Sequence, residues 1–304
     1  PYEAHLAALL AGEARRWPES TRRISELRLE IDYESHSAWF GGPSTLTLDI
    51  VDYPGEWLLD LPLMDMRYAE WAQASWADAR RPHREEVAAP WLQSGVGYRP
   101  EAQADEAIAE AASEGFKAYL ARLRAHPEAV AVLPPGRFLM PGDLEGSPAL
   151  TFAPLDVAAD AAFRPGSLGA LMEERFEAYK RIVVKPFFRD HFARLDRQIV
   201  LVDMLSALDA GAAAVADLES ALGQVLMAFR VGRNRWLSQF VAPRIDKVVF
   251  AATKADHLHH TSHDRLEALM RHVAGKAMLR AQGAGATVES MALAAVRATR
   301  EARI

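Results

Sequence analysis

The stretch DKVVFAATKAD, from Asp246 to Asp256, begins as an apolar strand and ends in a polar loop. A similar stretch, RQIVLVDML from Arg197 to Leu205, precedes it, with a helical pattern between the two. Strands of continuous Val, Ile and Leu joined by helices are typical of a parallel sheet that is covered on both faces. We therefore predict an α/β fold with a mostly parallel sheet. The expected order is strand 197–205, helix 212–229, strand 246–256, helix 262–280 and strand 290–296.

Two alternating segments nearer the start predict a β-hairpin. Ser25–Tyr33 alternates polar and apolar side chains, and Thr45–Val51 does the same after a Gly-Gly-Pro-Ser turn at Gly41–Ser44. The middle of the chain is Ala- and Arg-rich and mostly helical, with Glu101–His126 as its clearest amphipathic helix. We expect Pro186 to kink a second long helix there.

The spacing of the strands indicates an insertion. A βαβ crossover takes about 30 residues or more, and the interval from Asp203 to Thr253 is close to one crossover. The segment between the hairpin and Asp203 is several times longer than that. We therefore predict one domain made of residues 1–63 and 191–304, with an all-helical domain inserted at residues 64–190. The insertion is expected to serve either as a lid that moves with a ligand or as a binding domain for a protein partner.

The composition excludes several kinds of protein. The 304 residues are 50% hydrophobic, which allows a substantial core, and 41 acidic against 35 basic residues give a net charge of -6. This balance argues against a nucleic-acid-binding surface. The chain has no cysteine, which excludes disulfides and thiolate metal sites and fits a reducing, cytoplasmic location. No apolar run reaches the roughly 18 residues of a transmembrane segment.

Two predicted strand ends carry the side chains of a nucleotide site, since ligands of open α/β sheets bind outside the carboxyl ends of the strands. Asp52 and Gly55 form a D-x-x-G pattern, in which a carboxylate holds Mg²⁺ and a glycine N–H meets a γ-phosphate. Thr253, Lys254 and Asp256 form a T-K-x-D pattern. Its aspartate can accept from two adjacent donors of guanine, while the lysine stem lies along the base. Adenine lacks these donors, so the pattern favours GTP and GDP.

A purely structural interpretation stays open for each pattern taken alone. Asp52 and Gly55 can belong to a simple turn after a strand, and Lys254 to Asp256 can be a polar loop that caps the next helix. The occurrence of both patterns, in this order and at strand ends, favours the nucleotide interpretation.

Four blocks of sequence resemble the YcjX-like family of bacterial P-loop proteins. They are LDIVDYPGEWLLDLPLM from Leu48, PPGRFLMPGDLEGSPAL from Pro134, FARLDRQIVLVDML from Phe192 and IDKVVFAATKADH from Ile245. The similarity covers nearly the whole chain. It implies a P-loop NTPase-like G-domain with a helical insertion, guanine-nucleotide binding and an association with stress responses. By the same resemblance, the loop around Ala295 and Val296 matches the segment that backs the base through its main chain.

One element that the resemblance implies is missing. A P-loop, G-x-x-x-x-G-K-[ST], should precede the first of these strands. Gly41–Thr45 lacks the lysine and the spacing, and Gly283–Thr287 is too late and too short. Without a P-loop there is no backbone cradle or lysine for the phosphates. Either the chain is part of a longer protein, which we expect, or the protein does not hold triphosphates in the usual way.

Residues near the expected γ-phosphate position set the predicted rate of hydrolysis. Glu56 stands where many GTPases place a glutamine that orients water. A carboxylate can orient water too, but its charge is unfavourable beside a γ-phosphate, so slow hydrolysis is predicted. Upstream, Thr21 is a candidate Mg²⁺ ligand and Arg22 a candidate for stabilising the transition state. The alternative for this pair is a helix cap or a surface position.

The sequence thus predicts a slow, Mg²⁺-dependent GTPase switch with a role in bacterial stress. Two alternatives stay open: an ATPase of the same fold, or a non-hydrolysing scaffold whose helical domain binds a protein. Phe229–Arg244 mixes arginines with aromatic residues. It either contacts a membrane surface or a partner, or packs its aromatic side chains inward at a helix end.

Overall fold

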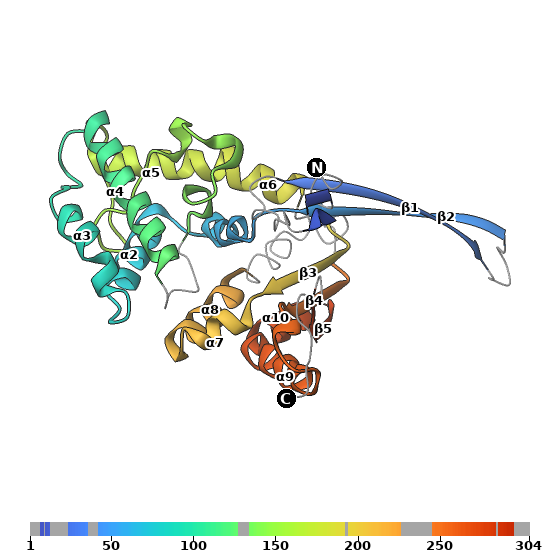
Figure 1. Ribbon diagram of the computed structural model, residues 1–304. Coiled ribbons are helices and arrows are strands. Elements are labelled where there is room, and N and C mark those ends of the chain that lie inside the picture. Colours follow the sequence, from blue (N-terminus) through green and yellow to red (C-terminus); the bar gives the residue numbers. More distant parts are fainter. Residues whose placement is uncertain are drawn as a thin grey trace.

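The computed structural model describes residues 7–8, 10–12, 24–35, 42–126, 134–191, 194–225, 245–283 and 285–294. These residues form an antiparallel hairpin, a helical region and a three-stranded parallel sheet with its own helices (Figure 1). The predicted mixture of helices with a parallel sheet is confirmed. Within the described residues, none of the helices combines the length and the hydrophobicity needed to cross a bilayer.

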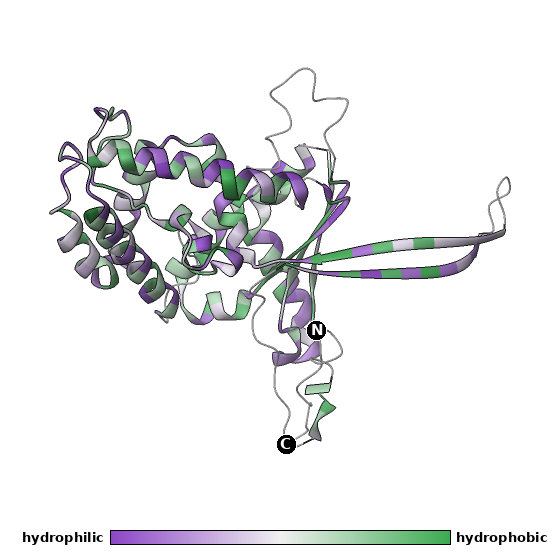
Figure 2. Cartoon of the chain, turned by 90° about the horizontal axis from the view of Figure 1, so that it is seen from above, coloured by the Kyte–Doolittle hydropathy of each residue, from purple (hydrophilic) through white to green (hydrophobic). Residues whose placement is uncertain are grey.

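The hairpin consists of β1 (Ser25–Ser35) and β2 (Gly42–Asp52), which pair from Ser25 with Asp52 to Ser35 with Gly42. It projects from the rest of the molecule as a long ribbon (Figures 1 and 2). The predicted hairpin is confirmed, although its strands are longer than expected and Gly42–Ser44 lies in β2 rather than in a turn. Because side chains alternate across a strand, one face is apolar, with paired leucines and isoleucines that are 39–52% exposed. The opposite face carries polar pairs such as Arg28 with Asp49.

The parallel sheet has the order β3-β4-β5, made of Arg197–Val202, Lys247–Ala252 and Thr287–Ala292. Its register pairs Val202 with Ala252 and Ala252 with Ala292, so the three carboxyl ends are level. The helices of this part are α7 (Met204–Asp209), α8 (Ala212–Val225), α9 (His263–Val273) and α10 (Gly275–Gly283). They cover one face, where Val200, Val248 and Phe250 are buried in a hydrophobic cluster. On the other face, Ile199 and Leu201 are each 62% exposed.

Several boundaries in this part differ from the predictions. The first two strands of the sheet are shorter than expected. β3 ends just before the polar residue Asp203, and β4 ends just before Thr253. The single helix expected at residues 262–280 is two helices separated at Ala274. The last strand begins at Thr287, three residues earlier than expected.

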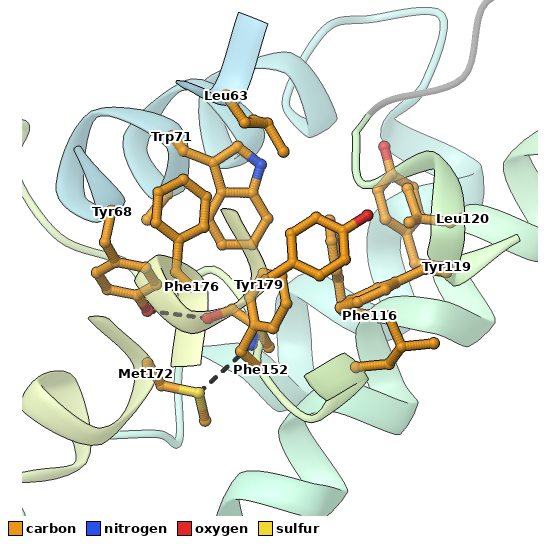
Figure 3. Packing of buried hydrophobic residues seen from close by; sticks show 14 of the residues in the cluster. Leu63, Tyr68, Trp71, Phe116, Tyr119, Leu120, Phe152, Met172, Phe176 and Tyr179 are labelled. Carbon is orange, nitrogen blue, oxygen red and sulfur yellow. Dashed lines mark hydrogen bonds between the residues drawn. The ribbon is translucent and has the colours of Figure 1, made fainter. Parts of the chain in front are cut away.

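The helical region is built around aromatic side chains. Its helices are η2 (Gly55–Asp65), α2 (Tyr68–Ala79), α3 (Glu85–Gly95), α4 (Glu106–Ala125), α5 (Leu168–Tyr179), η6 (Lys180–Val184) and α6 (Lys185–Asp190). Trp71, Phe116 and Phe176 are at most 1% exposed and pack together (Figure 3). The rings of Trp71 and Phe176 are stacked with centroids 5.1 Å apart. Burial of large aromatic side chains contributes strongly to stability, so this cluster is the main core of the region.

The expected kink at Pro186 takes the form of a π-helical turn. Lys180–Val184 is π-helical, and Pro186 lies at the start of α6, directly after it. Proline has no N–H and its ring crowds the preceding turn. A local widening from α- to π-helix accommodates both effects without ending the helix.

Candidate functional site

The carboxyl ends of β3, β4 and β5 are joined by backbone contacts into one edge. The N–H of Thr253 donates to the carbonyl of Val202 at 2.9 Å, and its hydroxyl donates to the same oxygen at 3.2 Å. On the other side, Leu293 N donates to Ala252 O at 2.8 Å, and Ala255 N donates to Leu293 O at 3.2 Å. The loop after β4 is therefore held between the ends of its two neighbours. This is the edge at which α/β sheets bind ligands.

Lys254 crosses this edge to the end of β3. Its backbone has a left-handed conformation with a φ of 60°, which is uncommon for a residue other than glycine. Its ammonium lies 2.5 Å from Oδ2 of Asp203, the residue directly after β3. Asp203 also caps α7, because its carboxylate accepts from Ser206 N at 3.1 Å and from Ser206 Oγ at 2.7 Å. Partial burial favours the neutral acid, but the hydrogen bonds from Lys254 and Ser206 outweigh it and hold the pKa of Asp203 below its usual value.

Asp256 lies in the same loop, in the short 3₁₀ turn Ala255–His257, and is half-buried. The N–H of His257 donates to Lys254 O at 3.0 Å and closes this turn. The described part of the chain runs on to Ala294, two residues after β5, and the residue before it, Leu293, contacts Ala255. The predicted base-contacting residues Ala295 and Val296 lie outside the described residues, as do the candidates Thr21 and Arg22 and the segment Phe229–Arg244.

The D-x-x-G residues lie at the junction of the hairpin and the helical region. Asp52 is the last residue of β2 and is exposed. The hydroxyl of Tyr53 accepts a hydrogen bond from Gln198 Nε2 at 3.2 Å, which places this segment beside the amino end of β3. Gly55 begins η2, and a Cβ built on it would meet no atom within 4 Å. The expectation that both patterns lie at the carboxyl edge of one parallel sheet is wrong, because β2 belongs to the antiparallel hairpin. Asp52 and Gly55 lie together, at the far end of β3 from Lys254 and Asp203.

Glu56 is turned toward the helical region. Its carboxylate lies 2.8 Å from the guanidinium of Arg124, near the end of α4. The next residues of η2 are part of the aromatic core, since Trp57 is 2% exposed and donates from Nε1 to Met140 O at 2.9 Å. Gly136 approaches Glu56 so closely that a Cβ on it would lie 1.9 Å from the Glu56 carbonyl oxygen. Contacts with α4 and with the loop around Gly136 therefore hold the segment after the D-x-x-G pattern in place.

One buried acid in η2 was not predicted. Asp60 is 2% exposed and accepts from Gly136 N at 2.7 Å and from Tyr179 Oη at 2.6 Å. Burial raises its pKa to about 6, although both hydrogen bonds act in the opposite direction. The signal in the sequence was a single acid within the apolar run WLLDLPLM that starts at Trp57. Its partners come from distant parts of the chain, so the sequence did not identify them.

A buried cluster of charged side chains connects the helical region with the parallel-sheet part. Arg84, just before α3, places its guanidinium 2.5 Å from Asp217 in α8, and both side chains are 4% exposed. Arg81 and His83 contact the same carboxylate at 3.1 and 3.2 Å. Asp203 and Asp217 were both missed as functional or structural acids. For Asp203, the available signal was its position directly after an apolar strand, as for Asp52.

Comparisons with known proteins identify the family. The family model described as "YcjX-like family, DUF463" matches residues 1–304. A protein of Shewanella oneidensis named Ras-like GTPase YcjX is 36% identical over 312 residues, covering 100% of this chain and 64% of the relative. An Escherichia coli K12 protein of the same name is 36% identical over 307 residues, covering 98% of this chain and 65% of the relative. The chain thus spans a little less than two thirds of the length of these curated relatives. The resemblance predicted from the four sequence blocks is confirmed, and the chain belongs to the YcjX-like family.

Proposed function

We propose that the protein containing this chain binds GTP and GDP and hydrolyses GTP slowly, as a nucleotide-dependent switch. Two relatives that match the whole chain, or nearly all of it, are named Ras-like GTPases. The observation that carries the proposal is the T-K-A-D loop at the level carboxyl edge of three parallel strands. A loop at that edge, held by both neighbouring strands, is suited to present Asp256 and the stem of Lys254 to a purine.

In this proposal the residues have separate roles. Asp256 accepts from the two donors of guanine, Lys254 covers the base, and Thr253 fixes the loop through its two bonds to Val202. Gly55 offers its N–H to a γ-phosphate, and Asp52 its carboxylate to Mg²⁺, after the D-x-x-G segment has moved from the amino end of β3 to the carboxyl edge on nucleotide binding. The loop at Ala295 and Val296 follows β5 and backs the base.

Magnesium fits the exposed carboxylate of Asp52. Mg²⁺ in nucleotide sites is usually bound by one or two carboxylates, with water and phosphate oxygens as the other ligands. Among the described residues, no group of three His, Cys, Asp or Glu side chains is arranged to hold a metal ion. Asp52, with Thr21 as a second candidate, would therefore share the ion with the nucleotide. When bound, Mg²⁺ neutralises charge on the phosphates.

We further propose that residues 64–190 are a helical domain inserted into a P-loop NTPase-like domain made of residues 1–63 and 191–304. Two separate hydrophobic clusters, one in the helical region and one beneath the sheet, support a division into two units, with η2 (Gly55–Asp65) packed into the cluster of the helical region. Glu56, directly after the D-x-x-G pattern, contacts Arg124 of α4 and Gly136. These contacts support a helical domain that moves with the state of the γ-phosphate. A role in bacterial stress and a protein partner for the helical domain are parts of the same proposal.

The test is a change of base specificity in the full-length protein. Wild type is expected to bind GDP at least 100-fold more tightly than ADP, because an unmatched buried carboxylate costs several kcal/mol. Asp256→Asn replaces an acceptor with a donor amide, which suits the 2-oxo group of xanthine better than the 2-amino group of guanine. The variant should therefore prefer XDP to GDP. Asp264→Asn, at an acid in the first turn of α9, is the control.

The alternatives give different results in the same assays. An ATPase would bind ADP as well as GDP, and Asp256→Asn would leave the base preference unchanged. A non-hydrolysing scaffold would bind nucleotide without turnover, and its partner would bind equally in the GDP and GTP states. Either result would overturn the corresponding part of the proposal.

A further inference from the structure

We propose that Asp203 is a positioning residue for the nucleotide base, which it serves by anchoring Lys254. This inference rests on the proposed guanine-nucleotide function and adds a residue to that site. Asp203 directly follows β3 and Lys254 lies in the loop after β4, and they are joined by the 2.5 Å contact between Nζ and Oδ2. The inference is that this contact holds the lysine stem along the carboxyl edge of the sheet.

The first step of the argument is the conformation of Lys254. A left-handed backbone at a lysine is unfavourable, and it persists where the surroundings determine it. Here the preceding residue, Thr253, is hydrogen-bonded to Val202. The turn after Lys254 is closed by the hydrogen bond from His257 N to Lys254 O. The starting point and direction of the lysine side chain are therefore fixed by the loop.

The second step is the rigidity of the anchor. The Asp203 carboxylate accepts two hydrogen bonds from Ser206, one from the backbone and one from the hydroxyl. It can hardly rotate without losing the cap of α7. An ammonium that pairs with a fixed carboxylate is itself held in place. The four methylene groups between the Lys254 backbone and its ammonium therefore span the edge in one arrangement.

The third step is the consequence for a ligand. A purine that donates to Asp256 has one face toward the stem of Lys254, and an immobilised stem costs less entropy on binding than a free one. The lysine side chain is 52% exposed, so part of its surface is available to a base. Asp203 thus affects how tightly a purine binds, whereas Asp256 decides which purine binds.

The test compares Asp203→Asn, Lys254→Met and the double variant in the full-length protein, using GDP and IDP as probes. Asparagine caps helices as well as aspartate does, so Asp203→Asn removes the charge and keeps the cap. We expect Asp203→Asn to weaken binding of GDP and of IDP by the same factor, up to about fivefold. Because IDP lacks only the 2-amino group, the ratio of the two affinities reports on Asp256 and should stay at the wild-type value. In the Lys254→Met background, Asp203→Asn should have no further effect.

The control is Glu289→Gln, which removes another ion pair of the same sheet. Glu289 lies 2.7 Å from Lys247 at the start of β4, away from the carboxyl edge. Its loss should leave both affinities unchanged. If Asp203→Asn lowers the melting temperature, Asp203→Ser provides a second uncharged cap, and the comparison is made with that variant.

The outcomes separate the two proposals. Wild type that does not bind GDP would overturn the proposed function itself. Wild type that prefers GDP, together with an Asp203→Asn variant of unchanged affinity, would overturn the role of Asp203 alone. So would effects of Asp203→Asn and Lys254→Met that multiply in the double variant, because Asp203 would then act independently of the lysine.

Discussion

Arg124, near the end of α4, holds the carboxylate of Glu56 at 2.8 Å, and Glu56 is the residue that follows the D-x-x-G pattern. The side chain proposed to act beside a γ-phosphate is therefore directed into the helical region. This contact adds a structural reason to expect the slow hydrolysis proposed above, besides the unfavourable charge. It also makes the orientation of Glu56 depend on the position of α4.

Release of this contact should increase GTP hydrolysis by a limited amount. The Arg124 and Glu56 side chains are 37% and 22% exposed, and such ion pairs contribute about 0.2–1 kcal/mol. Arg124→Gln is therefore expected to raise the single-turnover rate of the full-length protein by up to about fivefold. Arg124→Gln should not raise the rate in a protein that also carries Glu56→Ala. Arg122→Gln, on the same helix, is the control, and a rate unchanged by Arg124→Gln would show that the contact does not limit hydrolysis.

Asp60 should make the protein less stable as the pH rises. Its pKa is raised to about 6 in the folded state, from a usual value of 3.8. Between these two values the folded state retains a proton that the unfolded state has lost, so unfolding becomes easier with increasing pH. The loss is at most about 3 kcal/mol and should be complete above about pH 7. Urea unfolding of the full-length protein at pH 5 and pH 7.5 measures the part lost in this interval, about 1.4 kcal/mol.

Asp60→Asn removes the titrating group and can keep both hydrogen bonds, because its oxygen accepts from Gly136 and its amide donates to Tyr179. The variant should therefore lose less stability than wild type between pH 5 and pH 7.5. Asp156→Asn, at an exposed acid paired with Arg80, is the matched control and should retain the wild-type pH dependence. Equal pH dependence in wild type and Asp60→Asn would mean that Asp60 does not titrate in this range.

Gly136 should tolerate no side chain. A Cβ at this position would lie 1.9 Å from the carbonyl oxygen of Glu56, a backbone atom that cannot rotate away. Gly136→Ala is expected to lower the free energy of unfolding by about 3 kcal/mol or more, through displacement of the loop from η2. Gly275→Ala is the control, because its Cβ would meet no atom within 4 Å at the start of α10. A Gly136→Ala variant as stable as Gly275→Ala would contradict the close contact between this loop and η2.

Asp217 should be far more important for stability than its neighbour Glu219 on the same helix. Asp217 is buried against Arg84, and removal of one partner leaves an uncompensated buried charge. Asp217→Ala is expected to cost about 3–5 kcal/mol. Glu219 pairs with Lys276 at 2.8 Å at the surface, so Glu219→Ala should change the stability far less. Chemical denaturation of both variants tests this, and similar losses would show that the cluster around Asp217 does not connect α8 to the helical region.

The sequence by itself determined the local elements and the position of the T-K-A-D loop at a strand end. Continuous apolar runs ending at Asp203 and Thr253 predicted parallel strands, and strict alternation predicted the hairpin, because both patterns reflect which faces of a strand are buried. The four family blocks identified the family, since each is an uninterrupted run of residues.

Only the tertiary structure decided which residues contact each other across the chain. The pairs Glu56–Arg124, Asp60–Tyr179, Arg84–Asp217 and Asp203–Lys254 join residues from different elements. Their charge and polarity were visible in the sequence, but an ion pair or a buried hydrogen bond depends on distances of about 3 Å. Such distances follow from how helices and strands pack around the two hydrophobic clusters, and no local pattern of residues encodes that packing.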